Sequence, residues 1–188
     1  MAKSILTITL NPSVDKSSSV QHIVPEKKLR CEQPIYQPGG GGINVSRALK
    51  RLGLASTALF TSGGKTGSLL EGLLKLEDIA VDPIRVNGET RENFIVVDRS
   101  TNQQYRFGFP GEHVESNELE GIMASIAELK YIPDFVVISG SMPAGVPPEF
   151  IRSLIHTYKT KGSKIIVDTS GDSLHVALEE GVFLIKPN

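Results

Sequence analysis

Residues 38–44, Pro38-Gly39-Gly40-Gly41-Gly42-Ile43-Asn44, run directly into a segment with helical spacing of apolar residues. Residues 43–52 are expected to form an amphipathic helix. Its predicted buried stripe consists of Val45, Ala48, Leu49 and Leu52. Four glycines remove every Cβ before this helix, so backbone N–H groups can approach the oxygens of an anionic ligand at a helix end whose dipole favours negative charge. The alternative is a flexible turn; the position between a strand and a helix favours ligand binding.

Strand-like and helix-like segments alternate around this stretch. The strands are expected at residues 5–10, 56–60, 135–138, 164–167 and 183–185, and further helices at 68–76, 148–161 and 173–180. This alternation predicts an α/β fold with a mainly parallel, doubly wound sheet and helices on both faces.

Two other segments have a different sequence pattern, which predicts short strands joined by polar turns. Residues 94–97 and 105–109 read as a hairpin closed by residues 98–103. Residues 17–37 show a similar pattern of short strands. Segments of about 16–37 and 91–109 are therefore expected to pair into a small β lid beside the main domain.

The loops that follow the strands should share one rim, because ligands of open α/β sheets bind beyond the carboxyl ends of the strands. Asp15 lies in the first of these loops, where its carboxylate could accept two hydrogen bonds from a sugar diol; a helix cap or turn role is the alternative. Gly64-Lys65-Thr66 imitates the end of a phosphate-binding P-loop, but the earlier glycine that this motif requires is replaced by Leu59. A P-loop NTPase is therefore disfavoured.

Composition limits the partners. The 188 residues are 39% hydrophobic and carry 20 Lys and Arg against 21 Asp and Glu, a formal net charge of -1, so no broad field favours nucleic acid or a membrane surface. The single cysteine, Cys31, and the lack of a long apolar run predict a reduced, cytoplasmic protein, and the four histidines show no metal-ligand spacing. A phosphate would need a local basic cluster, for which Lys28, Arg30 and Arg91 are candidates; an ordinary charged surface is equally compatible with these three.

Taken together, these residues resemble the PfkB branch of the ribokinase family of carbohydrate kinases along the whole chain. Within it, residues 26–31 and 104–107 are most similar to the minor, ribokinase-type bacterial 6-phosphofructokinases. The motifs that carry the resemblance occur in the family's order: residues 11–15, 38–48, 90–93, 139–143 and 186–188.

The resemblance implies roles for individual residues. Those expected to hold the sugar hydroxyls are Asp15, Gly40, Gly41 and Asn44. Those expected around the sugar and its phosphate are Arg30, Arg91, Asn93 and Ser141. Lys28 would lean towards the transferring phosphates, and Lys186 and Asn188 would face the ATP phosphates and hydrated magnesium, without a direct metal ligand in this chain.

The reaction implied is ATP- and Mg-dependent phosphorylation of fructose 6-phosphate at its C1 hydroxyl, giving fructose 1,6-bisphosphate, with 1-phosphofructokinase or tagatose-6-phosphate kinase as alternatives. A non-catalytic sugar-phosphate binding fragment is the alternative of another class. The family's base aspartate and most of its adenine pocket are expected in a later carboxy-terminal segment, so the 188-residue chain alone is predicted to be inactive and marginally stable.

The lid is expected to close over the sugar and to form a homodimer contact. The apolar residues expected to serve that contact are Val20, Ile23, Ile35, Phe94 and Phe107.

Overall fold

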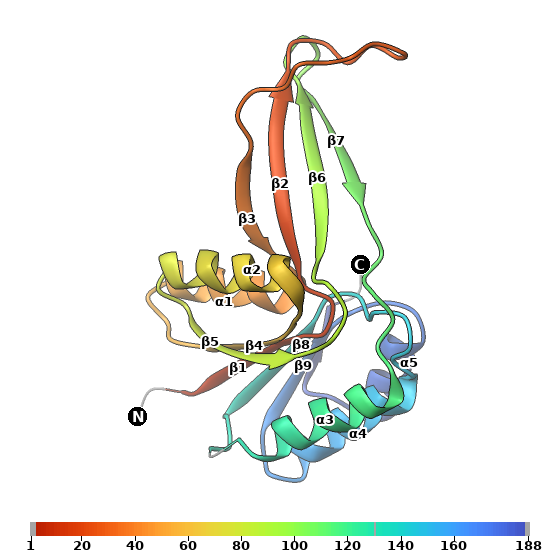
Figure 1. Ribbon diagram of the computed structural model, residues 1–188. Coiled ribbons are helices and arrows are strands. Elements are labelled where there is room, and N and C mark those ends of the chain that lie inside the picture. Colours follow the sequence, from red (N-terminus) through yellow and green to blue (C-terminus); the bar gives the residue numbers. More distant parts are fainter. Residues whose placement is uncertain (1–2, 130, 187–188) are drawn as a thin grey trace.

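The fold is built around one all-parallel sheet of six strands. The computed structural model describes residues 3–129 and 131–186 (Figure 1). The strand order is β10-β9-β8-β1-β4-β5. Strands β4 and β5 therefore lie on one side of the central strand β1, and β8, β9 and β10 lie on the other. The strands are β1 Ile5–Thr9, β4 Thr57–Ser62, β5 Ala80–Arg85, β8 Phe135–Ser139, β9 Lys164–Asp168 and β10 Leu184–Ile185. The predicted doubly wound sheet is confirmed.

Helices cover both faces of this sheet. Helices α1 (Gly41–Arg51) and α2 (Gly64–Leu76) lie on one face, and α3 (Ser116–Ala127), α4 (Pro148–Lys159) and α5 (Asp172–Glu179) on the other (Figure 1). Each face has its own apolar core: Ile43, Phe60 and Leu70 belong to the first, and Leu6, Ile8 and Ile151 to the second. Strand β1 is buried on both faces: Leu6 and Ile8 face the second core, whereas the buried Thr7 and Thr9 face α1 and form hydrogen bonds with Ser46 and with the Ile43 N–H.

A second sheet of four strands stands away from the main sheet, and we call it the lid sheet (Figure 1). Its order is β3-β2-β6-β7, with β2 Ser13–Val20, β3 Ile35–Gly39, β6 Arg91–Asp98 and β7 Gln103–Gly108. Strands β2 and β6 are parallel neighbours, and β3 and β7 pair antiparallel to them on the outside. The two segments expected to form a lid are thus joined in one sheet, as predicted.

The buried face of α1 differs from the predicted stripe. The helix begins at Gly41 and buries Gly42, Ile43 and Ser46, whereas Leu52 is 75% exposed. A Cβ on Gly42 would lie 2.6 Å from the Thr9 hydroxyl oxygen, so the glycine brings the helix against β1 more closely than a side chain would allow. Small residues rather than the Val45, Ala48, Leu49 and Leu52 stripe form the contact, and that prediction was wrong.

Three further differences concern element boundaries. Helix α2 begins at Gly64, ahead of the predicted residue 68, and two elements were missed: strand β5 and helix α3. Pro83 interrupts the strand pattern of β5, which tolerates it because β5 is an edge strand. In α3, Glu115 and Glu118 form a reciprocal capping box, a signal that was present in the sequence. Within the described residues, no helix combines the length and the apolar character needed to cross a membrane.

Candidate sugar-phosphate site

The loops after the parallel strands meet at one rim, as predicted. The backbone N–H of Gly140 donates to the Asp168 carbonyl at 2.9 Å, and the Asn11 side-chain amide donates to the Ser141 hydroxyl at 3.0 Å. Lys186 Nζ lies 3.2 Å from Asp168 Oδ1. These contacts connect the ends of β1, β8, β9 and β10, so the carboxyl ends of the strands form one continuous surface.

The glycine-rich bend lies at this rim and begins α1. Gly40 has φ 115° and forms the N-cap, a backbone conformation that a side chain would strain. A Cβ on Gly41 would approach the Ser139 hydroxyl to 2.4 Å. The bend therefore allows close packing of the backbone. Gly40 and Gly41 remain partly exposed, so their backbone atoms are also accessible to a ligand. Gly41 also lines a small rim pocket of about 160 Å³ with Ser139, Gly140, Ser141 and Asp168.

The main candidate pocket opens where the lid sheet meets α1. Its volume of about 340 Å³ falls within the roughly 300–1,000 Å³ typical of small-molecule sites. Four predicted site residues line it together: Asp15, Asn44, Arg91 and Asn93. Their convergence follows from the lid register, because Asp15 on β2 pairs directly with Asn93 on β6, while Asn44 projects from the first turn of α1.

Hydrogen bonds fix the orientation of the Asp15 carboxylate. Oδ1 accepts the Ser13 hydroxyl and the Asn93 side-chain amide, each at 2.9 Å. Asn93 in turn accepts a bond from Arg91 Nη1 at 3.1 Å through its own Oδ1. One carboxylate oxygen is thereby used within the protein, and Oδ2 remains for a ligand hydroxyl.

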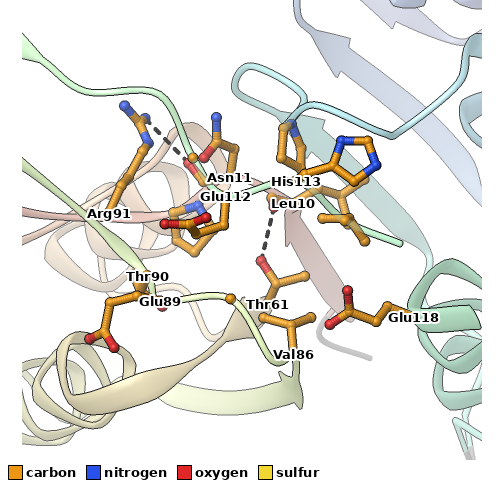
Figure 2. Close-up of a pocket in the computed structure, with 15 residues that line it drawn as sticks. Leu10, Asn11, Thr61, Val86, Glu89, Thr90, Arg91, Glu112, His113 and Glu118 are labelled. Atoms are coloured by element: carbon orange, nitrogen blue, oxygen red, sulfur yellow. Dashed lines mark hydrogen bonds between the residues drawn. The ribbon is translucent and has the colours of Figure 1, made fainter. Parts of the chain in front are cut away.

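Arg91 supplies the positive charge at the base of the pocket. Its guanidinium donates to the Phe109 carbonyl at 3.0 Å. It also donates to the Asn11 carbonyl at 3.3 Å (Figure 2). Burial lowers the pKa of Arg91, while the Asp15 charge opposes this shift, and the group stays protonated at neutral pH because its ordinary pKa is 12.5. The chain therefore holds the charged guanidinium group of Arg91 in a fixed position near Asp15.

A smaller cavity lies behind Arg91, between the rim and α3 (Figure 2). Its volume of about 30 Å³ suffices for roughly one water molecule. Glu89, Glu112 and Glu118 line it, so its charge repels a phosphate. Its small volume and its three carboxylates both disfavour a phosphorylated sugar in this cavity.

Arg106 lines the lid pocket and was missed as a site residue. It lies on β7 opposite Ile95, and Ile95 shares with Asn93 and Asp15 the face of the lid sheet that borders the pocket. The signal was available, because Arg106 belongs to the motif at residues 104–107 that carries part of the family resemblance.

The other predicted site residues lie elsewhere. Lys28 and Arg30 are exposed in the long connection between β2 and β3, at the end of the lid sheet that points away from the main sheet (Figure 1). Ser141 lines the rim pocket of about 160 Å³ beside Gly41, and Lys186 lies next to that pocket through its contact with Asp168. Asn188 lies outside the described residues. Within one chain, the lid pocket therefore gathers only part of the predicted set.

The N-terminus of α2 cannot hold a phosphate, because the chain fills it with its own carboxylate. Glu89 Oε1 accepts the Thr66 backbone N–H at 2.6 Å, and a Cβ on Gly64 would lie 1.7 Å from Glu89 Oε2. Bonds from Thr66 hold the pKa of Glu89 below its ordinary value. Rejection of the P-loop interpretation is thus confirmed. Among the described residues, no group of three or more His, Cys, Asp or Glu gathers to hold a metal ion.

Comparison with known protein families identifies the family of this chain. The model of the pfkB family carbohydrate kinases matches residues 4–188, and the chain belongs to this family. It is 41% identical over 185 residues to the ATP-dependent 6-phosphofructokinase isozyme 2 of Escherichia coli, covering 98% of this chain and 60% of the relative. The isozyme 2 of Mycobacterium tuberculosis is 41% identical over 182 residues, with 97% and 53% covered.

Other relatives carry other names, and solved structures share the fold. The 1-phosphofructokinase of Bacillus subtilis is 33% identical over 98% of this chain and 59% of its own length. The E. coli phosphofructokinase-2 solved in complex with fructose-6-phosphate superposes with a TM-score of 0.93 at 41% identity, over 99% of this chain and 61% of that one. A tetrameric inhibited form of the same E. coli protein superposes with a TM-score of 0.92 over the same shares of the two chains. The chain thus spans just over half to about 60% of the length of these relatives.

Proposed function

We propose that the protein carrying this chain transfers the γ-phosphoryl group of MgATP to the C1 hydroxyl of fructose 6-phosphate, giving fructose 1,6-bisphosphate. The observation that carries the proposal is the lid pocket, in which a fixed carboxylate, Asp15, lies beside two arginines, Arg91 and Arg106. A carboxylate accepts hydrogen bonds from a sugar diol, and guanidinium forks bind a phosphate monoester. The family and the two relatives at 41% identity support the same reaction class.

In this proposal the chain's own residues orient the acceptor. Asp15 and Asn44 hold the ketose hydroxyls, Gly40 and Gly41 bring backbone atoms to the same rim, and Arg91 with Arg106 neutralises the 6-phosphate. Phosphoryl transfer depends mainly on aligning the acceptor hydroxyl with the donor and on neutralising charge. Asn93 acts through Asp15, whose carboxylate it holds in place.

The nucleotide is expected at the neighbouring rim. Lys186 reaches this region through its contact with Asp168, and Ser139 donates to the other oxygen of the same carboxylate at 3.1 Å. One lysine and one carboxylate at an open rim suit a phosphate chain with its hydrated magnesium, and we assign Lys186 and Asn188 to it. Bound MgATP supplies the phosphoryl group.

We place the proton acceptor outside residues 1–188, since Asp15 is the lone carboxylate lining the lid pocket and is occupied in binding. General-base catalysis contributes about 10²–10⁴ in rate. A polypeptide of residues 1–188 alone is therefore predicted to be inactive. Marginal stability is also expected of it, because Phe183 and Leu184 are exposed beside the edge strand β10.

A homodimer through the lid sheet is a further part of the proposal. Phe107 is 52% exposed on the face that also carries Phe94, and large exposed apolar groups mark interaction surfaces. Ile35, 63% exposed, lies on the opposite face, which carries Arg106. Val20, by contrast, is buried within the chain, so the inclusion of Val20 among the exposed contact residues was wrong. Lys28 and Arg30 lie at the far end of the lid sheet, so in a dimer they would serve the site of the second copy. A cytoplasmic location, where ATP is supplied, completes the proposal.

A substrate panel tests the reaction. The full-length protein is assayed with ATP and fructose 6-phosphate, fructose 1-phosphate and tagatose 6-phosphate, and the product is identified by phosphorus NMR. We expect the highest kcat/KM with fructose 6-phosphate and phosphorylation at C1. A preference for either other substrate would assign one of the alternative kinases, and calorimetric binding without turnover would assign a non-catalytic binding protein.

A further inference from the structure

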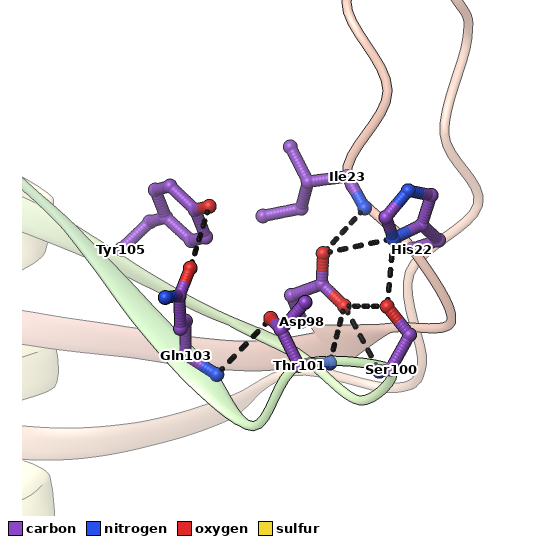
Figure 3. A network of polar contacts seen from close by, with 7 residues as sticks. All are labelled: His22, Ile23, Asp98, Ser100, Thr101, Gln103 and Tyr105. Carbon is purple, nitrogen blue, oxygen red and sulfur yellow. Dashed lines mark hydrogen bonds and ion pairs between the residues drawn. The ribbon is translucent and has the colours of Figure 1, made fainter.

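The far end of the lid sheet contains a buried carboxylate that the proposed reaction does not use. Asp98 ends β6 and is only 2% exposed. Its Oδ1 accepts three hydrogen bonds from its own turn: the Ser100 N–H at 2.9 Å, the Ser100 hydroxyl at 2.6 Å and the Thr101 N–H at 3.3 Å (Figure 3). These bonds close the turn between β6 and β7.

The second oxygen faces a different segment. Asp98 Oδ2 accepts the Ile23 backbone N–H at 2.9 Å and lies 3.2 Å from His22 Nδ1 (Figure 3). Ile23 is 75 residues away in sequence, at the start of the connection between β2 and β3. We call residues 21–34 the basic loop, because they include Lys27, Lys28 and Arg30. The carboxylate therefore ties the basic loop to the β6–β7 turn.

The returning end of the basic loop is attached to β2 instead. The Glu32 N–H donates to the Ser19 carbonyl at 2.9 Å, the Ser18 hydroxyl donates to the Glu32 carbonyl at 2.8 Å, and the exposed Arg99 and Glu32 side chains lie 3.4 Å apart. An exposed pair of this kind contributes little. Of the described residues, those from Val24 to Cys31 form no hydrogen bond or ion pair with the chain, so the placement of the basic side chains depends on the two ends.

We propose that Asp98 is a positioning residue, which fixes the start of the basic loop and thereby presents Lys28 and Arg30 to phosphate groups of the bound substrates. The inference rests on the proposed function, because it assumes that these two side chains contact substrate phosphates. Asp98 itself, at the far end of the lid sheet, touches no substrate.

Replacement by asparagine separates the two tasks of this carboxylate. Asn has one carbonyl oxygen and one NH₂ group, and the three donors of the β6–β7 turn favour the oxygen on their side. The NH₂ group then faces the Ile23 N–H, and two donors cannot bond each other. Asp98→Asn is therefore expected to keep the turn and to release the basic loop.

Thr101→Ala is the matched control. It removes the hydroxyl that accepts the Gln103 N–H at 3.4 Å within the turn, and it leaves the Ile23 bond to Oδ2 and the 2.7 Å contact between Ser100 and His22 intact. Both variants are made in the full-length protein, and their melting midpoints are recorded first, so that loss of folding is recognised.

Trypsin sensitivity of the native protein reports loop release without reference to activity. For Asp98→Asn we expect cleavage after Lys27, Lys28 or Arg30, identified by mass spectrometry, to be about five-fold faster than in the parent, and for Thr101→Ala less than about two-fold faster. Unchanged cleavage in Asp98→Asn would overturn the inference.

Steady-state kinetics report the consequence for the substrate. Asp98→Asn should raise KM for fructose 6-phosphate or ATP roughly 10-fold, the loss expected for a charge-assisted phosphate contact, while kcat falls less than about two-fold. A purely structural role would lower the active fraction, and hence the apparent kcat, at constant KM, and that result would also overturn the inference. Failure of the proposed function is seen separately, as absence of turnover in the parent.

Discussion

Asp15 is held from two sides before any ligand arrives. Ser13 and Asn93 both donate to Oδ1, and Asn93 is fixed by Arg91, so a chain of three hydrogen bonds determines where the carboxylate points. Preorganisation of this kind means that binding energy is not used to order the side chain. At the residue scale, the orientation of Asp15 thus depends on the pairing of β2 with β6.

Substitution of Asp15 tests this arrangement. Asp15→Asn preserves the shape but weakens the bond to the ketose hydroxyls, and a hydrogen bond to a charged group contributes about 1.5–3 kcal/mol. We expect kcat/KM for fructose 6-phosphate to fall roughly 10- to 100-fold in the full-length protein. Glu120→Gln, an exposed change on α3, is the control and should leave kcat/KM unchanged. Equal kinetics for parent and Asp15→Asn would exclude Asp15 from the site.

Individual elements depend on carboxylates that lie far away in sequence. Helix α2 has no side-chain cap of its own; Glu89, from the segment before β6, accepts the Thr66 N–H instead. Strand β1 is attached at its start in the same way, because Asp134 accepts bonds from the Ser4 N–H at 2.9 Å and from Lys3 at 2.7 Å. These contacts set the ends of the elements that frame the rim.

The α2 contact has a measurable effect on stability. Glu89→Ala removes the acceptor at the helix N-terminus, and loss of an N-terminal cap costs about 0.5–2 kcal/mol, with the lower half of this range expected because Glu89 is exposed. Urea unfolding of the protein measures the change, with Glu120→Ala as the control. An unchanged free energy of unfolding would show that water replaces the Glu89 carboxylate without loss.

The contact at β1 depends on pH. Bonds from Lys3 and Ser4 lower the pKa of Asp134 from 3.8 to about 2. The folded state therefore favours the ionised carboxylate, and its stabilisation is fully present above pH 3.8 and is lost as the pH falls towards about 2. The difference in melting midpoint between the parent and Asp134→Asn should be largest near neutral pH and shrink in acid. A difference that stays constant over this range would contradict the assigned pKa.

At the scale of the whole molecule, the lid sheet exposes both of its faces. One face borders the lid pocket, and the other carries a row of paired residues across all four strands, with the Lys16 ammonium 5.3 Å from the Tyr36 ring centroid and 5.5 Å from that of Phe94. Phe107 pairs with Phe94 in this row. Helices cover this face only at its base, where Val14 packs with Ile43 and Leu70, so the aromatic row beyond it is suited to a second copy of the chain.

Disruption of this face should change the oligomeric state. Phe107→Lys places a charge in the aromatic row, and sedimentation of the full-length protein is expected to show a smaller species than the parent at the same concentration. Leu76→Lys, at an 85% exposed position on α2, is the control and should sediment like the parent. Identical sedimentation of the Phe107→Lys protein would remove the lid sheet from the interface.

The sequence was sufficient for the architecture because alternating strands and helices predict the sheet. Asp15 was expected in the loop after the first strand, but the structure places it within the lid strand β2, because the chain enters the second sheet already at Ser13. The buried face of α1 was not predictable from hydrophobicity, since Gly42 and Ser46 make the contact. The distance of Lys28 and Arg30 from the pocket was equally hidden, because it depends on the length of the lid sheet.

A crystal structure of the full-length protein with fructose 6-phosphate tests the central claim most directly. The account predicts the ketose between Asp15 and Asn44, with its phosphate directed to Arg91 and Arg106. A sugar phosphate bound at the N-terminus of α2, or in the acidic cavity beside Glu112, would contradict it.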